Sequence, residues 1–121
     1  IRTKSRHSYK VYDYQKICDI AAAPHFTYRD KDVFDMAFLE WDNTARYREK
    51  ATIYKGCTPP IFEKNFRRLV QKAEQKPEGR RFVYINAWNE WAEGTYLEPD
   101  EKNGYGYLEA VQRVMQERTQ N

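Results

Sequence analysis

The sequence has few cysteines and few histidines, which limits the metal and redox chemistry it can support. Of its 121 residues, two are cysteine and two are histidine, and no C-x-x-C pair occurs. Zinc sites built from clustered Cys and His ligands are therefore not expected, and we predict no bound metal and no other cofactor. Cys18 and Cys57 are enough for one disulfide, yet two reduced thiols in a reducing compartment are the favoured interpretation.

Long apolar runs are also missing. No stretch approaches the roughly 20 consecutive apolar residues that a membrane-spanning helix needs, so no transmembrane segment is expected. The chain begins at Ile1 rather than methionine and carries no signal-peptide pattern, and we expect it to be a piece of a longer protein. The expected location is the cytoplasm, with any membrane association made through partners.

Neither sign of charge dominates the chain. The 21 lysines and arginines are interleaved with 18 aspartates and glutamates, which leaves a net charge of +3. Such a mixture is typical of a solvated surface and differs from the basic stripe of a nucleic-acid-binding protein, so nucleic-acid binding is not expected. The densest basic group falls on a predicted helix and is interpreted as its solvent-exposed face: Lys64, Arg67, Arg68 and Lys72.

Aromatic residues, in contrast, are abundant. The chain holds 3 tryptophans, 10 tyrosines and 6 phenylalanines. A charged fraction of 32% would by itself favour disorder, but these rings supply large surfaces that can be buried. The length suits one domain or a part of one. We therefore expect a folded segment whose core is more aromatic than aliphatic.

Helical and strand patterns alternate along the chain. The predicted elements are a helix over 14–23, a strand over 33–41, a helix that starts at Thr58 and ends before Pro77, a strand over 81–88 and a helix over 107–118. Asp13 and Thr58 are the predicted N-caps of the first two helices. Residues 1–10 and 42–57 are predicted to be an extended or frayed tail and a long loop.

This order, α-β-α-β-α, predicts an α/β fold built from parallel βαβ units. Both predicted strands are nearly continuous apolar runs, which is typical of strands buried on both faces. Such strands need other strands beside them in the sheet. A (β/α)₈ barrel of the TIM type takes about 250 residues. We predict that residues 1–121 form the C-terminal portion of such a barrel, preceded by one extra helix. An isolated α/β sandwich is the alternative, and its bare sheet edges would favour self-association.

Both predicted strands end in charged and aromatic residues. The first is followed by Glu40-Trp41-Asp42-Asn43 and Arg46, and the second runs into Trp88-Asn89-Glu90-Trp91-Ala92-Glu93. Active sites of parallel α/β folds lie at the C-terminal ends of the strands. If the two strands are neighbours, both clusters share one rim, and this rim is the predicted site.

The residue types at this rim suit sugar chemistry, since rings stack on pyranose faces while carboxylates bind hydroxyls or transfer protons. Glu90 and Glu93 are the predicted catalytic pair, provided that the chain turns helically after Trp88 and so brings positions i and i+3 to one side. A loop-capping role for Asn43 and a core-packing role for Trp88 stay open. The predicted substrate-binding residues are Trp41, Asp42, Asn43, Arg46, Trp88, Asn89, Trp91 and Tyr96.

The segment W-N-E-W-A-E-G-T-Y-L-E-P at residues 88–99 resembles the WbsX family, glycosyltransferases of bacterial lipopolysaccharide and surface-polysaccharide biosynthesis. Residues 41–46 with Thr58-Pro59, and Gly106-Tyr107-Leu108-Glu109-Ala110, extend the resemblance in the family's order. The resemblance implies that this chain is the C-terminal segment of a longer enzyme whose partners are a glycan or a sugar donor and acceptor.

The WbsX family is in turn similar to glycoside hydrolase family 99, whose (β/α)₈ barrels carry a W-N-E-W-x-E-G segment. This similarity implies that Glu90 assists at the sugar 2-hydroxyl and that Glu93 is the general acid/base. Ala92 stands where those hydrolases commonly have histidine, so their substrate contacts are not carried over. An endo-acting glycoside hydrolase and a noncatalytic glycan-binding module are the alternatives, and no turnover is expected from the 121-residue chain alone.

Overall fold

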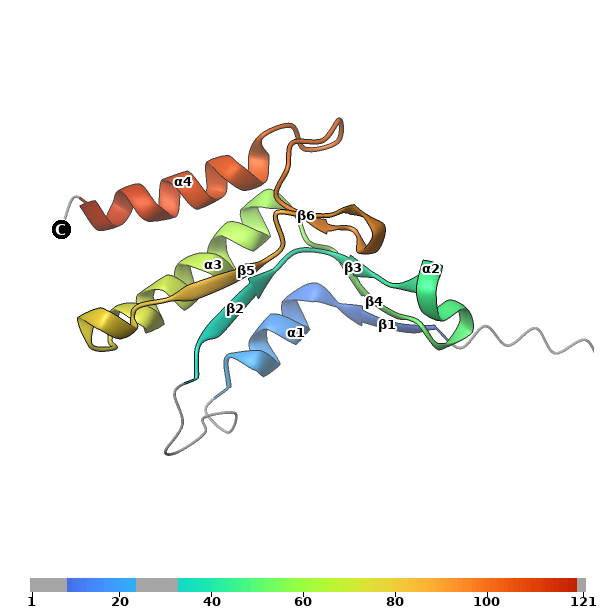
Figure 1. The fold of residues 1–121 in the computed structure, drawn as a ribbon, viewed down its shortest axis with the longest axis horizontal. Helices are drawn as coiled ribbons and strands as arrows, with labels where there is room; N and C mark the ends of the chain where they lie inside the picture. Colours follow the sequence, from blue (N-terminus) through green and yellow to red (C-terminus); the bar gives the residue numbers. More distant parts are fainter. Residues whose placement is uncertain (1–8, 24–32, 120–121) are drawn as a thin grey trace, which may run out of the picture.

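The computed structural model describes residues 9–23 and 33–119, and it has an α/β architecture (Figure 1). Residues 1–8 of the tail predicted over 1–10, and the predicted polar loop at 24–32, lie outside the described residues, whereas Lys10 belongs to β1. The helices are α1 (Tyr14–Ala21), α2 (Thr44–Tyr47), α3 (Pro59–Glu74) and α4 (Gly106–Thr119). The strands are β1 (Lys10–Asp13), β2 (Asp35–Phe38), β3 (Trp41–Asp42), β4 (Thr52–Lys55), β5 (Val83–Asn86), β6 (Asn89–Glu90) and β7 (Thr95–Tyr96).

The two strands predicted from apolar runs are neighbours. β2 and β5 pair in parallel, with Asp35 opposite Val83 and Phe38 opposite Asn86. A second sheet has the order β1-β4-β3, in which β1 and β4 are parallel while β3 and β4 are antiparallel. β6 and β7 form a short antiparallel hairpin. The predicted parallel βαβ arrangement is therefore confirmed for β2, α3 and β5.

The prediction of an unstructured connection over residues 42–57 is wrong, because this segment contains α2 and β4. β1 was also not predicted, so the described residues begin with a strand and the order is not simply α-β-α-β-α. β1 (K-V-Y-D) and β4 (T-I-Y-K) are four residues long and contain one aliphatic residue each, which gives too little apolar signal to identify them. They form because they pair with each other, from Lys10 opposite Thr52 to Asp13 opposite Lys55.

The predicted starts of α1 and α3 are confirmed, although only one uses the expected bond. The Asp13 carboxylate accepts a hydrogen bond of 2.9 Å from the Lys16 N–H, as an N-cap does. Thr58 precedes α3 without making such a side-chain bond, and Pro59 and Pro60 occupy the first two helical positions. Proline at this point loses little, since those N–H groups would lack helical partners in any case.

The apolar residues of α4 do not all face the core. Leu108 and Val111 are only half-buried and Met115 is 41% exposed, whereas the buried residues are Tyr107, Ala110 and Val114. α4 lies close to the start of α3 at Gly106, where an added Cβ would lie 2.9 Å from the Pro59 side chain. The buried positions 107, 110 and 114 are spaced as one helical face, and this face packs on α3.

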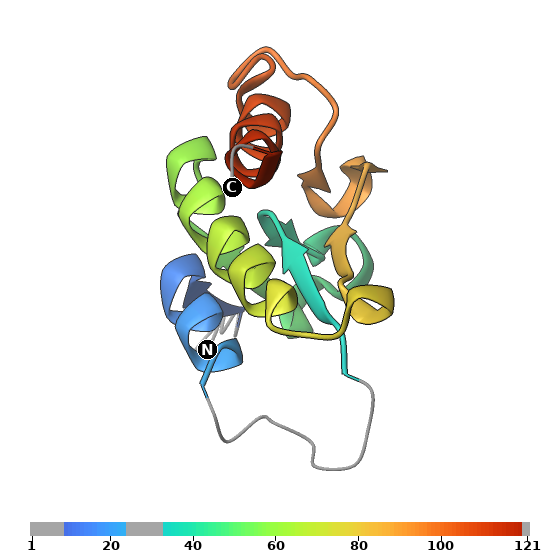
Figure 2. The same cartoon turned by 90° about the vertical axis from the view of Figure 1, so that its left-hand side faces the viewer.

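The prediction of a core more aromatic than aliphatic is wrong for the described residues, since four of their fifteen buried apolar side chains are aromatic and nine are aliphatic. Aromatic rings nevertheless make contacts at its centre. The rings of Phe62 and Phe66 stack at 5.7 Å, and Tyr107 packs edge-on against Phe62 at 5.6 Å. Tyr14 is almost fully buried, and its hydroxyl donates a 2.7 Å hydrogen bond to the Phe38 carbonyl. α3 lies between α1 and α4 and packs against β2 and β5 (Figure 2). Cys18 and Cys57 are both buried and free.

One face of the β2–β5 pair stays exposed, so the predicted burial of both faces is not found in the described chain. α3 covers the first face. On the second face the cross-strand neighbours Met36 and Tyr84 are 54% and 58% exposed. Large apolar side chains on a sheet face normally lie against another layer.

Over the described part of the chain, no helix is both long and apolar enough to cross a membrane.

Candidate functional site

The ends of β2 and β5 meet at one edge of the sheet and are tied together by a threonine. Because the strands are parallel, Leu39 and Ala87 both leave the sheet at this edge. Thr95, which is fully buried on β7, donates a 2.6 Å hydrogen bond from its Oγ1 to the Asn86 carbonyl. The same Oγ1 accepts a 3.4 Å bond from the Leu39 N–H. This hydroxyl therefore joins both strand ends to the β6–β7 hairpin.

The chain turns sharply after β5 instead of continuing as a strand. The Asn86–Ala87 peptide bond is cis, and β6 is followed by a 3₁₀ turn over Trp91–Glu93. Gly94 then adopts φ of +69°, a left-handed conformation that glycine enters without a steric penalty. A 3₁₀ turn has three residues per turn, so Glu90 at its start and Glu93 at its end are not on opposite faces of an intact strand.

Glu93 is the buried carboxylate of the site. It is only 8% exposed. Its Oε1 lies 3.8 Å from Nη1 of Arg46, whose side chain is mostly exposed and comes from α2. An exposed partner at this distance contributes little to stability. Within residues 9–23 and 33–119, no group donates a hydrogen bond to Glu93, which leaves its oxygens available to a ligand.

Glu90 has a different environment from Glu93. It lies on β6 with Asn89, and both side chains are exposed. The backbone pairs Glu90 with Thr95 and Asn89 with Tyr96. Two carboxylates three residues apart therefore differ in burial, which is the kind of difference that allows two acids to take different roles.

Trp91 and Tyr96 form an aromatic stack beside these carboxylates. Their ring centroids are 3.7 Å apart and the planes are 14° from parallel. The Trp91 Nε1–H donates to a Glu98 oxygen, and the Tyr96 hydroxyl donates a 2.8 Å bond to Asp100. Desolvation, followed by the hydrogen bond to Asp100, raises the pKa of Tyr96 to about 12. Tyr96 is therefore a neutral hydrogen-bond donor at physiological pH.

Trp88 does not pack in the core of the described chain, since its side chain is 54% exposed. Trp91 also exposes about half of its surface, on the side away from Tyr96. Exposed indole faces next to a carboxylate can stack on the apolar faces of sugar rings. Trp88 is therefore not a core residue of the described chain. Its stacking on a sugar stays a prediction.

The cluster after β2 has partly structural contacts. Trp41 is half-buried on β3, opposite Tyr54. Asp42 accepts a 2.9 Å hydrogen bond from the Thr44 N–H, and Asn43 accepts one of 2.8 Å from the Thr52 N–H. Asn43 therefore holds the start of β4 in place, as the loop-capping interpretation suggested. Arg46, from the same cluster, contacts the β6–β7 hairpin through its ion pair with Glu93.

Sequence reasoning missed Thr95, although a signal for it exists. Thr95 and Leu97 are buried while Tyr96 between them is half-buried, which is the alternation of a strand. A hydroxyl at an inward position directly after a turn glycine indicates a side chain that bonds to nearby backbone. For metals, no suitable group of three or more His, Cys, Asp or Glu side chains occurs among the described residues.

Known proteins resemble this chain over most of its length. The family description "Glycosyltransferase WbsX" matches residues 2–111. WxcX of Xanthomonas campestris pv. campestris strain B100 is 36% identical over 107 residues, which cover 87% of this chain and 15% of that protein. WxcX of strain ATCC 33913 is 42% identical over 88 residues, 72% of this chain and 13% of that protein.

The chain thus spans about 15% of the length of the curated relatives it matches. No solved structure is significantly similar to it. The family match extends over nearly all of the described fold and includes both strand-end clusters. The chain belongs to the glycosyltransferase WbsX family.

Proposed function

We propose that this chain is part of the catalytic domain of a carbohydrate-active enzyme, a glycosyltransferase that builds bacterial lipopolysaccharide or another surface polysaccharide. Family membership supports the enzyme class. The observation that carries the proposal is Glu93, a buried carboxylate at the joined ends of β2 and β5 that accepts no hydrogen bond from the described residues. Exposed indoles of Trp88 and Trp91 lie on the same hairpin connection.

In this proposal a sugar ring stacks on the exposed indole faces while its reacting bond lies near Glu93. Glu93 exchanges a proton with the oxygen of the glycosidic bond that is made or broken, as a general acid or base. The Arg46 guanidinium, 3.8 Å away, balances the charge of the ionised carboxylate. Glu90, exposed at the start of the turn, binds a sugar hydroxyl beside the reacting carbon.

We also propose that the chain supplies the C-terminal βα units of a (β/α)₈ barrel in longer members of the family. The parallel neighbours β2 and β5, with α3 packed on one face, are compatible with that architecture. The exposed apolar face of Met36 and Tyr84 suits the packed interior of a barrel. The relatives, of which this chain covers 15% or less, have the length for the other strands.

The proposal is tested by Glu93→Gln in a full-length family member that contains this segment. Removing a general acid/base lowers turnover by about 10²- to 10⁴-fold. Sugar binding, measured by calorimetry with the purified glycan, should stay within a factor of about two to three, because the amide keeps the shape of the carboxyl group. Glu101→Gln, at an exposed turn position, is the matched control and should retain activity.

Two other functions give different results in the same assays. A glycan-binding module would lose affinity in Trp91→Ala and would be unaffected by Glu93→Gln. A glycoside hydrolase would release reducing ends from a glycan in water, whereas a transferase requires an activated donor. Unchanged turnover in Glu93→Gln contradicts the catalytic role of Glu93.

A further inference from the structure

The β6–β7 hairpin with its flanking residues, 88–98, is acidic although the chain as a whole is basic. This hairpin segment contains three glutamates and no lysine, arginine or histidine, whereas the net charge of the chain is +3. Arg46 lies 3.8 Å from Glu93 and compensates that carboxylate. Glu90 and Glu98 form no ion pair within residues 9–23 and 33–119. The hairpin segment therefore keeps two negative charges that the described chain does not compensate.

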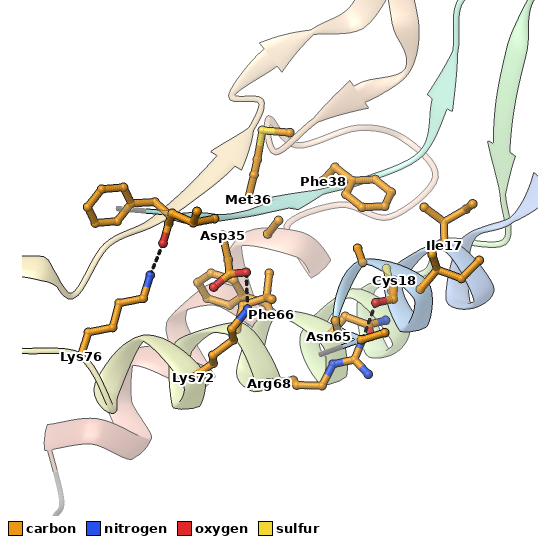
Figure 3. Close-up of a pocket in the computed structure, with 18 of the residues that line it drawn as sticks. Ile17, Cys18, Asp35, Met36, Phe38, Asn65, Phe66, Arg68, Lys72 and Lys76 are labelled. Atoms are coloured by element: carbon orange, nitrogen blue, oxygen red, sulfur yellow. Dashed lines mark hydrogen bonds and ion pairs between the residues drawn. The ribbon is translucent and has the colours of Figure 1, made fainter. Parts of the chain in front are cut away.

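Charged side chains around the large cavity of the described structure, in contrast, have partners. This cavity of about 820 Å³ lies between α1, β2 and α3, and Lys72 on its rim is 2.8 Å from Asp35 (Figure 3). Arg68, which also lines the cavity, lies 3.0 Å from Asp19. These cations are already engaged, so the uncompensated charge of the hairpin segment is the stronger indication of a charged ligand.

Glu98 is bonded to both tryptophans of the hairpin segment. Its backbone N–H donates a 3.1 Å hydrogen bond to the Trp88 carbonyl, and its Oε2 accepts a bond from the Trp91 Nε1–H. Its Oε1 accepts no hydrogen bond from the described residues. Glu98 is half-buried, while both indoles expose about half of their surface. One oxygen of a half-buried carboxylate is thus left open beside the Trp91 indole.

A protonated amine suits this arrangement better than a hydroxyl. Taking a carboxylate partly out of water is unfavourable unless its charge is compensated, and a hydroxyl does not compensate it. An ammonium also binds to the face of an aromatic ring, most strongly to tryptophan. Tyr96 covers one face of Trp91, and the other face is open. An ammonium can therefore contact both the Glu98 carboxylate and an indole.

A divalent metal ion is the other cation to weigh. Such ions take six or more oxygen ligands in proteins, several of them commonly carboxylates. The described part of the chain has no suitable group of three or more His, Cys, Asp or Glu side chains. An ammonium has only three donors and is satisfied by one or two acceptors and a ring. The donor set of the hairpin segment thus fits an amine.

We propose that the sugar bound at this site carries a free, protonated amino group, which the Glu98 carboxylate and the Trp91 indole recognise. This inference rests on the proposed function, because it names the class of sugar that the same site takes. A sugar with a carboxylate is repelled by the uncompensated glutamates, and an N-acetylated amino sugar lacks the cation. Glu93 stays available for the reacting bond.

The test is an NMR titration of the 121-residue chain, followed at the indole N–H signals of Trp88 and Trp91. Three sugars with one ring configuration are compared at equal, low ionic strength: glucosamine, N-acetylglucosamine and glucuronate. At about pH 6 the amine is protonated and the glutamates are ionised. Glucosamine should bind about fivefold or more tightly than N-acetylglucosamine, and glucuronate should bind most weakly.

Binding of glucosamine that is no tighter than that of N-acetylglucosamine would overturn the proposal, as would the absence of a saturable shift with glucosamine. Ammonium chloride tests for the charge alone and should give no saturable shift, since it lacks the sugar ring. If it binds as tightly as glucosamine, recognition of an amino sugar is contradicted. A preference for N-acetylglucosamine rejects the amino group and leaves the proposed function standing, because that function is tested by turnover of Glu93→Gln.

Glu98→Gln removes the charge but keeps an acceptor for the Trp91 N–H, so the preference for glucosamine over N-acetylglucosamine should fall to about twofold or less. Glu78→Gln is the matched control and should retain the preference, since Glu78 is exposed and precedes β5, at the opposite end of that strand. Circular dichroism checks the fold. If Glu98→Gln does not fold, Glu90→Gln removes the other uncompensated charge and should lower the same preference. An unchanged preference in the folded variant contradicts the proposal.

Discussion

At the scale of single residues, the site depends on side chains that bond to backbone groups of other segments. Thr95 joins the ends of β2 and β5, and Asn43 holds the start of β4. Neither needs to touch a substrate to affect the site. Glu93, in contrast, has a single long ion pair with Arg46 and no donor within the described chain. The polar atoms of Thr95 and Asn43 are thus used in backbone contacts, whereas the carboxylate of Glu93 is left for the catalytic role that we propose for it.

Thr95→Val should destabilise the fold by about 1–3 kcal/mol, because the isosteric side chain leaves the buried Leu39 N–H without a partner. Urea unfolding followed by tryptophan fluorescence measures this change. Thr58→Val is the control, since Thr58 makes no side-chain capping bond, and its effect should be below about 0.5 kcal/mol. A Thr95→Val chain as stable as the wild type would show that this hydroxyl does not hold the strand ends.

At the scale of elements, α3 organises the described structure. Its Arg68 bonds to Asp19 and to the Cys18 carbonyl on α1. On its other side, Glu63 accepts hydrogen bonds from Arg113 of α4 and from Arg67 one turn along α3. The hydrogen bond from Arg113, together with that from Arg67, lowers the pKa of Glu63 from its ordinary value. α3 thus contacts α1 through the Arg68–Asp19 ion pair and α4 through the Glu63–Arg113 ion pair.

Glu63→Gln should lower the stability of the α3–α4 pair by at most about 1 kcal/mol at pH 7, the scale of a partly exposed ion pair. The pKa of Glu63 is lower in the folded chain than in the unfolded chain, where it is about 4.3. The ionised Glu63 carboxylate therefore stabilises the fold above about pH 4.3, and this stabilisation is lost as the pH falls through the folded-state pKa. The melting temperatures of wild type and variant should therefore converge near pH 3.

Lys64→Gln, which alters an exposed lysine of the same helix without an ion pair in the described structure, is the control for the effect of a changed charge. A difference between wild type and Glu63→Gln that stayed constant from pH 7 to pH 3 would contradict the role of the ionised carboxylate.

At the scale of the whole molecule, the described chain has a covered side and an uncovered side. α1, α3 and α4 lie together, with α3 in the middle and packed on the β2–β5 pair (Figure 2). The opposite face presents Met36 and Tyr84, and Phe82 just before β5 is also exposed. In water, apolar surface of this kind favours association.

We predict that the 121-residue chain self-associates through this face. Sedimentation velocity should show an average mass that rises with protein concentration. Met36→Lys with Tyr84→Lys should shift the chain towards monomer, because charges at two cross-strand neighbours repel a second apolar surface. Met115→Lys, at an exposed position of α4, is the control and should leave association unchanged. A wild-type chain that is monomeric at every concentration would contradict this prediction.

The sequence by itself determined the features whose signal is local. Continuous apolar runs identify β2 and β5, the Thr-Pro-Pro start and apolar stripe identify α3, and the spacing of Glu90 and Glu93 identifies the candidate pair. β1 and β4 were not predicted, since four-residue strands with one aliphatic side chain each depend on pairing with distant segments.

Only the tertiary structure decided which of the two glutamates is buried, because burial of Glu93 depends on how the hairpin folds back on the strand ends. It also paired Glu93 with Arg46, which lies far away in the sequence, and made Thr95 the link between the strands. A local pattern can indicate that Thr95 bonds to backbone, but the partners of Thr95 and Glu93 in distant segments are set only when the chain folds.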